Sequence, residues 1–387
     1  MSTCLQPTGG ELYFVATPTS TDKCLPARIP ALDGIRGLAI ALVLARHLIS
    51  VSLEQADQLD GWKYTLWYWI KLGGFGVDLF FVLSGFLITR ILLENQNSPR
   101  LFRAFYLRRC CRILPLYFSL LFGVFLLHHF VHADPLRSLL FGDQYPWASY
   151  LTFTQNFAMA VGATTGGLAL AVTWSLAVEE QFYLGLPWVI RWVPARYLPW
   201  LFASGIPWAL LVRFHWNDWR SRVWLPGHTD SLLTGCLLAW VCLQPGALAW
   251  LQRQGRGLTA LLVILGGGIF VINQMPEYYV WITDTWMTLF FGVLVLIGIS
   301  QRGHVITKFL ELRWLGFLGM ISYGVYLLHF PVNSIVFWLL HKTTPVINNA
   351  SDLMLTFLGF ALTLALATLS WFFFEKRWVK LGHQAKY

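Results

Sequence analysis

Two residues near the start of the chain combine a base with a cation in an otherwise apolar stretch. Arg36 and His47 are 11 residues apart. On an α-helix with 3.6 residues per turn this is about three turns, so the two should share one face, about 16 Å apart along the axis. Neutral imidazole accepts a proton near pH 7, which makes His47 a candidate general base. The alternative is a histidine that only hydrogen-bonds a neighbouring helix. Arg46 points about 100° away, and we expect it to pair with a carboxylate or to reach the outer interface.

A second polar group lies in the segment WSLAVEEQFY at 174–183. Glu179, Glu180, Gln181 and Tyr183 stand close together in a run that otherwise resembles a membrane helix, where such groups are costly and usually functional. A carboxylate beside an imidazole can orient the ring or stabilise its charged form. We therefore expect Glu179 to lie next to His47. The alternative is a structural ion pair with Arg46 or another cation.

A basic cluster precedes a third apolar run. Arg108 and Arg112 are four residues apart, which places them on one helix face, and Arg109 lies beside them. Guanidinium groups bind phosphates in a bidentate manner, so the cluster suits a phosphorylated substrate. The alternative is that these arginines only anchor the cytoplasmic end of a membrane helix.

Other polar residues interrupt the apolar runs. Asp78 is an isolated carboxylate, and we expect it to pair with a cation of the first helix. Ser84 could be a nucleophile, but a serine beside a glycine more often serves helix packing. His329 could face the same cavity as His47, or could accompany a kink at Pro331. The residues expected to bind the acceptor or to line the cavity are Asp78, Tyr183, Tyr323 and His329.

The composition identifies the class of protein that positions these groups. The chain has 387 residues, 56% of them hydrophobic and only 12% charged, against roughly 25% charged residues in soluble domains. This excludes disorder, a coiled coil and an ordinary soluble enzyme. The net charge of +9 indicates basic cytoplasmic loops rather than binding to nucleic acid. The six cysteines form no CxxC pair, and we expect neither a disulfide framework nor a metal site.

The apolar runs predict an all-α polytopic bundle. A membrane helix needs about 20 mostly apolar residues, and continuous helix satisfies the backbone hydrogen bonds in lipid. About ten windows qualify: 35–53, 66–93, 113–131, 175–193, 198–215, 229–243, 258–274, 284–300, 314–340 and 353–375. The Gly- and Thr-rich segment 132–173 is expected outside, as a partial cover over the bundle.

The distribution of Lys and Arg predicts the orientation. With both termini in the cytoplasm, 20 of the 28 basic residues lie inside and 7 outside, as the positive-inside rule favours. We therefore expect a cytoplasmic tail at 1–30, a transmembrane domain at 31–375 and a basic cytoplasmic tail at 376–387.

Five runs that contain these residues occur in an order typical of one family: LDGIRGLA…RH, GGFGVDLFFVLSGFLITR, FYLRRCCRILPLY, WSLAVEEQFYL and SYGVYLLHFPV. Together they resemble the acyltransferase 3 family of bacterial integral-membrane acyltransferases, over about 30–375. Some members carry a second, esterase-like domain, and we expect this chain to be the single-domain form. Arg46 directly before the histidine is less usual.

The resemblance implies an enzyme of the plasma (inner) membrane with no tightly bound cofactor. Its co-substrate would be acyl-CoA, usually acetyl-CoA, and its acceptor a hydroxyl of a carbohydrate or glycolipid, such as a surface polysaccharide or its lipid-linked precursor. In this resemblance His47 matches the essential histidine, Arg36 its partner arginine and Glu179 the invariant acid. Arg108, Arg109 and Arg112 match the basic motif associated with the acyl donor.

The expected mechanism follows from these roles. The cytoplasmic arginines hold the nucleotide end of acyl-CoA, and the thioester reaches His47, which deprotonates the acceptor hydroxyl. An acyl-histidine or acyl-serine intermediate stays open. The alternative from another class is a lipid-linked sugar flippase or small-molecule transporter, because intramembrane His, Glu and Arg also build substrate paths. A non-catalytic scaffold for polysaccharide assembly would leave the buried charges unexplained.

Overall fold

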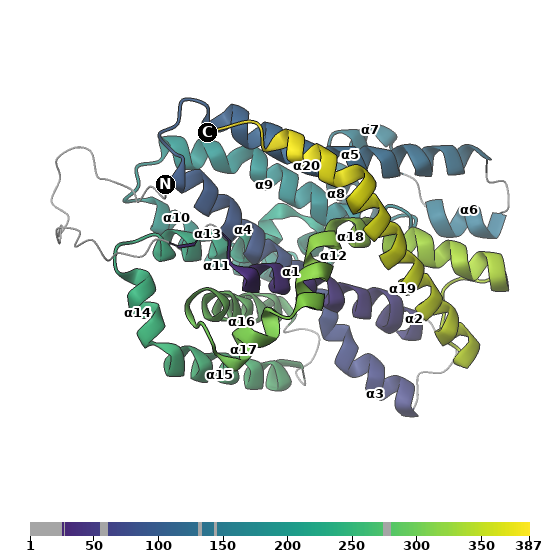
Figure 1. Ribbon diagram of the computed structural model, residues 1–387. Helices are drawn as coiled ribbons and strands as arrows, with labels where there is room; N and C mark the ends of the chain where they lie inside the picture. Colours follow the sequence, from purple (N-terminus) through teal and green to yellow (C-terminus); the bar gives the residue numbers. More distant parts are fainter. Residues whose placement is uncertain (1–24, 27, 55–60, 131–133, 143–144, 274–279) are drawn as a thin grey trace.

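The computed structural model describes residues 25–26, 28–54, 61–130, 134–142, 145–273 and 280–387. Within these ranges the chain forms helices and contains no strand (Figure 1). The expected tail at 1–30 falls mostly outside the described residues, as do Cys4 and Cys24.

The first half of the chain forms the following helices: α1 (Pro30–Leu44), a π-helix (Ala45–Ser50), α2 (Val51–Glu54), α3 (Gly61–Ile70), a 3-10 turn (Lys71–Phe75), α4 (Gly76–Glu94), α5 (Leu101–Phe130), α6 (Asp134–Phe141), α7 (Trp147–Leu151), α8 (Gln155–Gly162) and α9 (Thr173–Trp192). The segment expected to cover the bundle contains three of them, α6, α7 and α8. Of these, α8 packs against α9.

The second half continues with α10 (Leu198–Ala203), α11 (Gly205–His215), α12 (Trp219–Val223), a 3-10 turn (Leu225–His228), α13 (Thr229–Cys242), α14 (Ala247–Arg253), α15 (Gly255–Asn273), α16 (Val280–Ser300), α17 (Val305–Leu310), α18 (Arg313–His341), α19 (Ala350–Ser370), a π-helix (Trp371–Glu375) and α20 (Lys376–Gly382).

Seven of the described helices are long and apolar enough to cross a membrane, or eight if the bent pair Leu225–Cys242 and Ala247–Arg253 forms one span. Two of the expected windows, 175–193 and 198–215, do not form a helix that is long and apolar enough to cross a membrane. The first is α9, a 20-residue helix that contains Glu179, Glu180 and Arg191, and the second divides into α10 and α11. The multi-pass helical fold is therefore as expected, whereas the number ten stays a prediction.

The centre of the bundle is α1, which packs against α4, α16, α17 and α18. Its inward residues are small or branched, and Ala31, Ile35, Ala39 and Ile40 have no exposed surface. A Cβ atom on Gly37 would collide with the backbone carbonyl of Leu315 on α18. Small residues at such crossings let backbones approach closely, which is how membrane helices associate.

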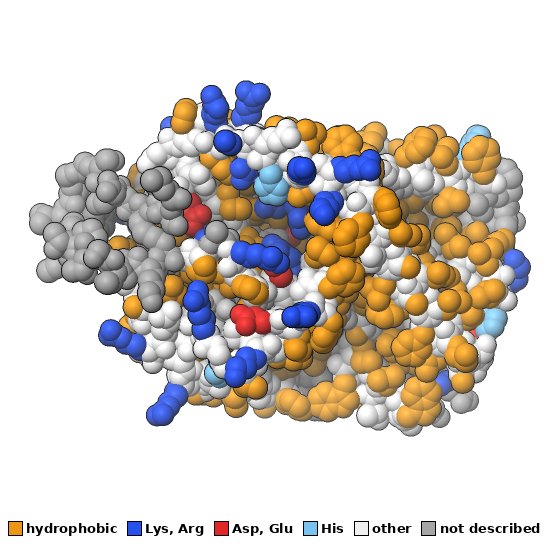
Figure 2. Space-filling model, in the orientation of Figure 1, with side chains coloured by type: hydrophobic (Ala, Val, Ile, Leu, Met, Phe, Trp, Pro, Cys, Tyr) orange, Lys and Arg blue, Asp and Glu red, His pale blue; other side chains and the backbone are white. Residues whose placement is uncertain are grey.

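The two described chain ends lie at the same end of the molecule (Figure 1). Lys and Arg side chains gather toward that end in the matching view, while apolar side chains dominate the opposite half (Figure 2). Arg90 on α4 donates to the backbone oxygens of Leu25 and Pro26, and Arg108 on α5 donates to that of Ala385. We refer to this region as the basic end of the bundle.

Candidate functional site

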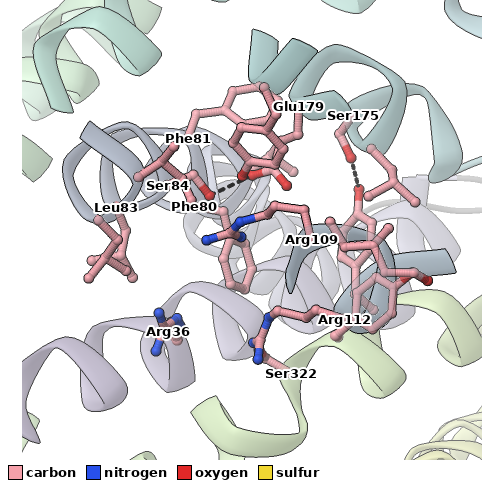
Figure 3. A pocket seen from close by; sticks show the side chains of 18 residues that line it. Arg36, Phe80, Phe81, Leu83, Ser84, Arg109, Arg112, Ser175, Glu179 and Ser322 are labelled. Atoms are coloured by element: carbon pink, nitrogen blue, oxygen red, sulfur yellow. Dashed lines mark hydrogen bonds between the residues drawn. The ribbon is translucent and has the colours of Figure 1, made fainter. Parts of the chain in front are cut away.

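A cavity of ≈ 120 Å³ lies between five helices. Its lining comes from α1, α4, α5, α9 and α18: Arg36, Val77, Phe80, Phe81, Leu83, Ser84, Leu87, Ile88, Arg109, Arg112, Ile113, Ser175, Leu176, Glu179, Tyr183, Ser322, Tyr323 and Tyr326. Three guanidinium groups enter it, from α1 and α5 (Figure 3). The lining therefore combines three guanidinium groups with a carboxylate and several aromatic rings.

The α5 arginines divide between the cavity and the C-terminal segment. Arg109 and Arg112 line the cavity, and Arg109 also lies 5.2 Å from the ring centre of Tyr183. Arg108 does not line it: its Nε donates to the backbone oxygen of Ala385 at 2.9 Å, and its guanidinium lies 4.5 Å from the ring centre of Tyr387. Of the two arginines expected to act together, Arg112 therefore lines the cavity and Arg108 does not. Adjacent side chains on a helix diverge by about 100°, and here Arg109 with Arg112, at i and i+3, shares the inner face.

Arg36 reaches the same cavity from α1. Its guanidinium forms an ion pair of 2.9 Å with Asp33, one turn earlier on the same helix, and its side chain keeps 28% of its surface exposed. Asp33 also accepts from Arg28. The carboxylate therefore orients Arg36 without burying it, and leaves guanidinium N–H groups available to a ligand.

Glu179 lies in the cavity with a serine rather than a histidine. The Ser84 hydroxyl donates to Glu179 Oε1 at 2.7 Å, which connects α4 to α9 (Figure 3). The predicted contact with His47 was wrong: neither residue is a hydrogen-bond or ion-pair partner of the other among the described residues. Sequence reasoning treated Ser84 mainly as a packing residue and missed this bond.

His47 instead bonds to the second membrane histidine. His47 Nδ1 lies 2.9 Å from His329 Nε2 on α18, and the two rings are nearly parallel, at 8°, with centres 5.1 Å apart. Phe330 stacks on His47 at 4.7 Å. The helix changes to π geometry at Ala45–Ser50, so extrapolating α-helical spacing from Arg36 fails beyond residue 44. π-helical turns occur frequently at functional sites.

Tyr326 contacts both the cavity and the second histidine of this pair. It lines the cavity, and its ring centre is 6.0 Å from that of His329, one helical turn along α18. Its hydroxyl bonds to the Ser175 hydroxyl and donates to the backbone oxygen of Val172. Neither His47 nor His329 lines the cavity itself. Sequence reasoning did not single out Tyr326 or Ser175; the repeat of Ser322, Tyr323 and Tyr326 along one helix was the available signal.

Two tyrosines that were expected to line the cavity do so. Tyr183 on α9 is buried there, and Tyr323 donates its hydroxyl to the backbone oxygen of Ile113 at 2.8 Å. Arg46 forms an ion pair of 3.1 Å with Glu54, which confirms the expected carboxylate partner.

Asp78 belongs to a separate buried network. It lies 3.3 Å from His228 Nδ1 and accepts from the hydroxyl of Ser231, so the expected partner on the first helix was wrong. Nearby, Asp230 pairs with Arg213, and both are almost fully buried. A buried pair of this kind joins α11 to α13.

Comparison with known proteins completes the description of the site. The sequence model described as "Acyltransferase domain" matches residues 29–372. The chain is 29% identical over 370 residues to the peptidoglycan O-acetyltransferase OatA of Listeria monocytogenes, covering 90% of this chain and 55% of that protein. It is 28% identical over 335 residues to the O-acetyltransferase OatA of Staphylococcus aureus (79% and 51%), and 30% identical over 341 residues to the putative peptidoglycan O-acetyltransferase YrhL of Bacillus subtilis (79% and 48%).

The chain thus spans about half the length of the curated relatives that it matches. No solved structure matches it. Since the match to the domain model includes every helix that lines the cavity, the chain belongs to the acyltransferase 3 family.

Proposed function

We propose that this protein is a membrane O-acetyltransferase that moves an acetyl group from acyl-CoA to a hydroxyl of a cell-wall carbohydrate. The observation that carries the proposal is the cavity in which Arg36, Arg109 and Arg112 meet Glu179, inside a helical bundle of the acyltransferase family. Guanidinium groups in such a place cost free energy unless they bind an anion or a developing negative charge.

The donor enters from the basic end of the bundle in this proposal. CoA carries phosphates at its nucleotide end and a thin thioester arm, and the basic end supplies cations for the phosphates. Arg109 and Arg112 guide the arm into the cavity, whose volume of ≈ 120 Å³ suits a small acyl group. As the tetrahedral intermediate forms, the guanidinium groups stabilise its oxyanion.

The acceptor enters from the opposite end and meets the donor near Tyr326. His47 takes the proton of the acceptor hydroxyl, the hydroxyl oxygen bonds to the thioester carbon, and the carbon–sulfur bond breaks. The proton on His47 then passes to the departing thiolate, so that CoA–SH leaves and the ester remains. In this proposal Tyr326 moves during the step, because it lines the cavity and lies beside His329.

The names of the relatives indicate the acceptor class. The relatives in Listeria and Staphylococcus are named as O-acetyltransferases, and the first of these names specifies peptidoglycan. For this chain we propose a sugar hydroxyl of peptidoglycan or of its lipid-linked precursor, at the plasma membrane.

The test is acetyl transfer by the full-length protein in membranes. Labelled acetyl-CoA is added with purified peptidoglycan fragments, and base-labile label on the sugar is measured with release of free CoA. We expect transfer by the wild-type protein and at most background transfer by His47→Ala. Full activity of His47→Ala would overturn the proposed role of His47. Movement of a lipid-linked sugar across the bilayer without consumption of thioester would support the flippase or transporter instead.

A further inference from the structure

The hydrogen bonds of the two membrane histidines form a continuous series from a backbone carbonyl. His329 Nδ1 lies 3.2 Å from the carbonyl oxygen of Val325, one turn earlier on α18, and His329 Nε2 lies 2.9 Å from His47 Nδ1. His329 has no exposed surface. Each of the three nitrogens is therefore within hydrogen-bond distance of one identified partner.

The chemistry of these partners sets the direction of both bonds. A carbonyl oxygen only accepts, so the proton in the first bond belongs to His329 Nδ1. A neutral imidazole protonated at Nδ1 carries a lone pair at Nε2, which makes His329 the acceptor in the second bond. The donor is then the N–H at Nδ1 of His47. In a neutral His47 ring this leaves Nε2 unprotonated, and that nitrogen is the one able to remove a proton.

The opposite direction for the second bond would need protons on both nitrogens of His329. That ring would be a cation with no exposed surface, and no described carboxylate pairs with either histidine. Burying an unpaired charge costs far more than burying a neutral hydrogen-bonded ring. The neutral series therefore fits the surroundings, which are the aromatic rings of Phe330 and Tyr326.

From this geometry we infer that His329 is a positioning residue that holds His47 in the Nδ1–H tautomer, which makes Nε2 the basic nitrogen of His47. The inference deepens the proposed function and rests on it for the role of His47. Phe330 supports the arrangement by stacking on His47, which opposes a flip of the ring. His329 acts here as the orienting carboxylate does in other base-catalysed acyl transfers, but without introducing a charge into the bilayer.

The direct test is the tautomer of His47 in the full-length protein. The protein is labelled with ¹⁵N-histidine in lipid nanodiscs, and the His47 signals are identified by their loss in His47→Gln. We expect a protonated Nδ1 and an unprotonated Nε2 in the wild type, and a mixture of tautomers in His329→Leu. A wild-type His47 protonated at Nε2 would overturn the inference even if the enzyme is active.

The kinetic test compares two substitutions at position 329. His329→Leu removes the acceptor and should lower kcat roughly 10- to 100-fold, as loss of an orienting partner commonly does, while the KM for acetyl-CoA changes less than twofold. His329→Gln keeps an acceptor at a similar distance and should recover part of kcat. The matched control is His341→Leu on the same helix, where the histidine bonds to Asp352 and kcat should be unchanged.

The outcomes separate this inference from the proposed function. Wild-type kcat in His329→Leu would contradict the positioning role, and so would equal loss in both His329 variants with retained folding. Activity in His47→Ala would overturn the proposed function while leaving the tautomer measurement valid. If His329→Leu does not fold, the wild-type spectrum and His329→Gln still decide the matter.

Discussion

Arg108 and Arg109 are adjacent in sequence but face different surroundings. Arg109 enters the cavity with Arg112, whereas Arg108 is bound by the backbone oxygen of Ala385 and covered by the Tyr387 ring. The basic cluster of α5 is therefore divided in this structure between an inner pair, Arg109 and Arg112, and Arg108, which is held by the C-terminal segment. Each arginine should contribute differently to donor binding.

The first prediction compares these arginines. Changing Arg109 and Arg112 together to Gln should raise the KM for acetyl-CoA roughly tenfold or more, since two charge-assisted hydrogen bonds are lost. Arg108→Gln, the matched control, should raise it less. Steady-state transfer with varied acetyl-CoA measures both. An equal effect of Arg108→Gln, or a fall in kcat alone, would contradict the division.

The second prediction concerns Ser84. Ser84→Ala removes one donor to the Glu179 carboxylate and should lower stability by about 0.5–1.5 kcal/mol, because one hydrogen bond between α4 and α9 is lost. We expect residual acetyl transfer, since the proposed base is His47. A thermal melt of the protein in nanodiscs and the transfer assay check these results. Complete loss of transfer with intact folding would favour an acyl-serine intermediate instead.

At the scale of elements, helix crossings decide which side chains meet. A close crossing joins α4 to α13, where a Cβ on Gly85 would collide with the backbone of Leu232 and one on Gly235 with that of Val82. Because Ser84 and Asp78 are both on α4, this crossing sets the rotation of α4, with Ser84 in the cavity and Asp78 in the network of His228.

The third prediction tests this crossing. Gly85→Ala should destabilise the protein by roughly 1–3 kcal/mol, as overpacking of a close contact does. Gly123→Ala on α5 is the control, because a Cβ there meets no atom within 4 Å, and it should leave stability unchanged or slightly increased. Thermal melts of both variants measure the two changes in stability. Equal melting temperatures would show that the α4–α13 crossing accommodates the added methyl group without loss of stability.

At the scale of the whole molecule, charge is distributed along one direction. The described ends of the chain lie at the basic end (Figure 1), and many Lys and Arg side chains gather there (Figure 2). The positive-inside rule assigns such an end to the cytoplasm. The donor and acceptor sides of the proposed reaction would then be separated by the bilayer, with the cavity between them.

The fourth prediction follows from this separation. In sealed inside-out vesicles, acetyl-CoA added externally should be consumed, because the basic end then faces the medium. In sealed right-side-out vesicles it should be consumed only after permeabilisation, which also serves as the control for active protein. Equal consumption in both sealed preparations would contradict a donor site that opens only at the basic end.

Much of the protein followed from sequence because the bilayer imposes simple rules. Low charge and long apolar runs predict a helical membrane fold, since a chain in lipid must satisfy its own backbone hydrogen bonds. The same rules selected Arg36, Glu179, Tyr183 and Tyr323, because polar groups in lipid are costly and so are usually functional. All four line the cavity.

The pairing of these residues depended on the tertiary structure. Glu179 meets Ser84 rather than His47, Asp78 meets His228, and His47 meets His329, 282 residues away in the chain. Periodicity along one helix indicates which residues share a face, but the partner depends on how that helix is rotated against its neighbours and on irregular turns such as the π-helix at Ala45–Ser50. The sequence alone therefore determined the class of molecule and indicated several of the polar residues that line its cavity. The packing of the helices decided which polar residues bond to one another.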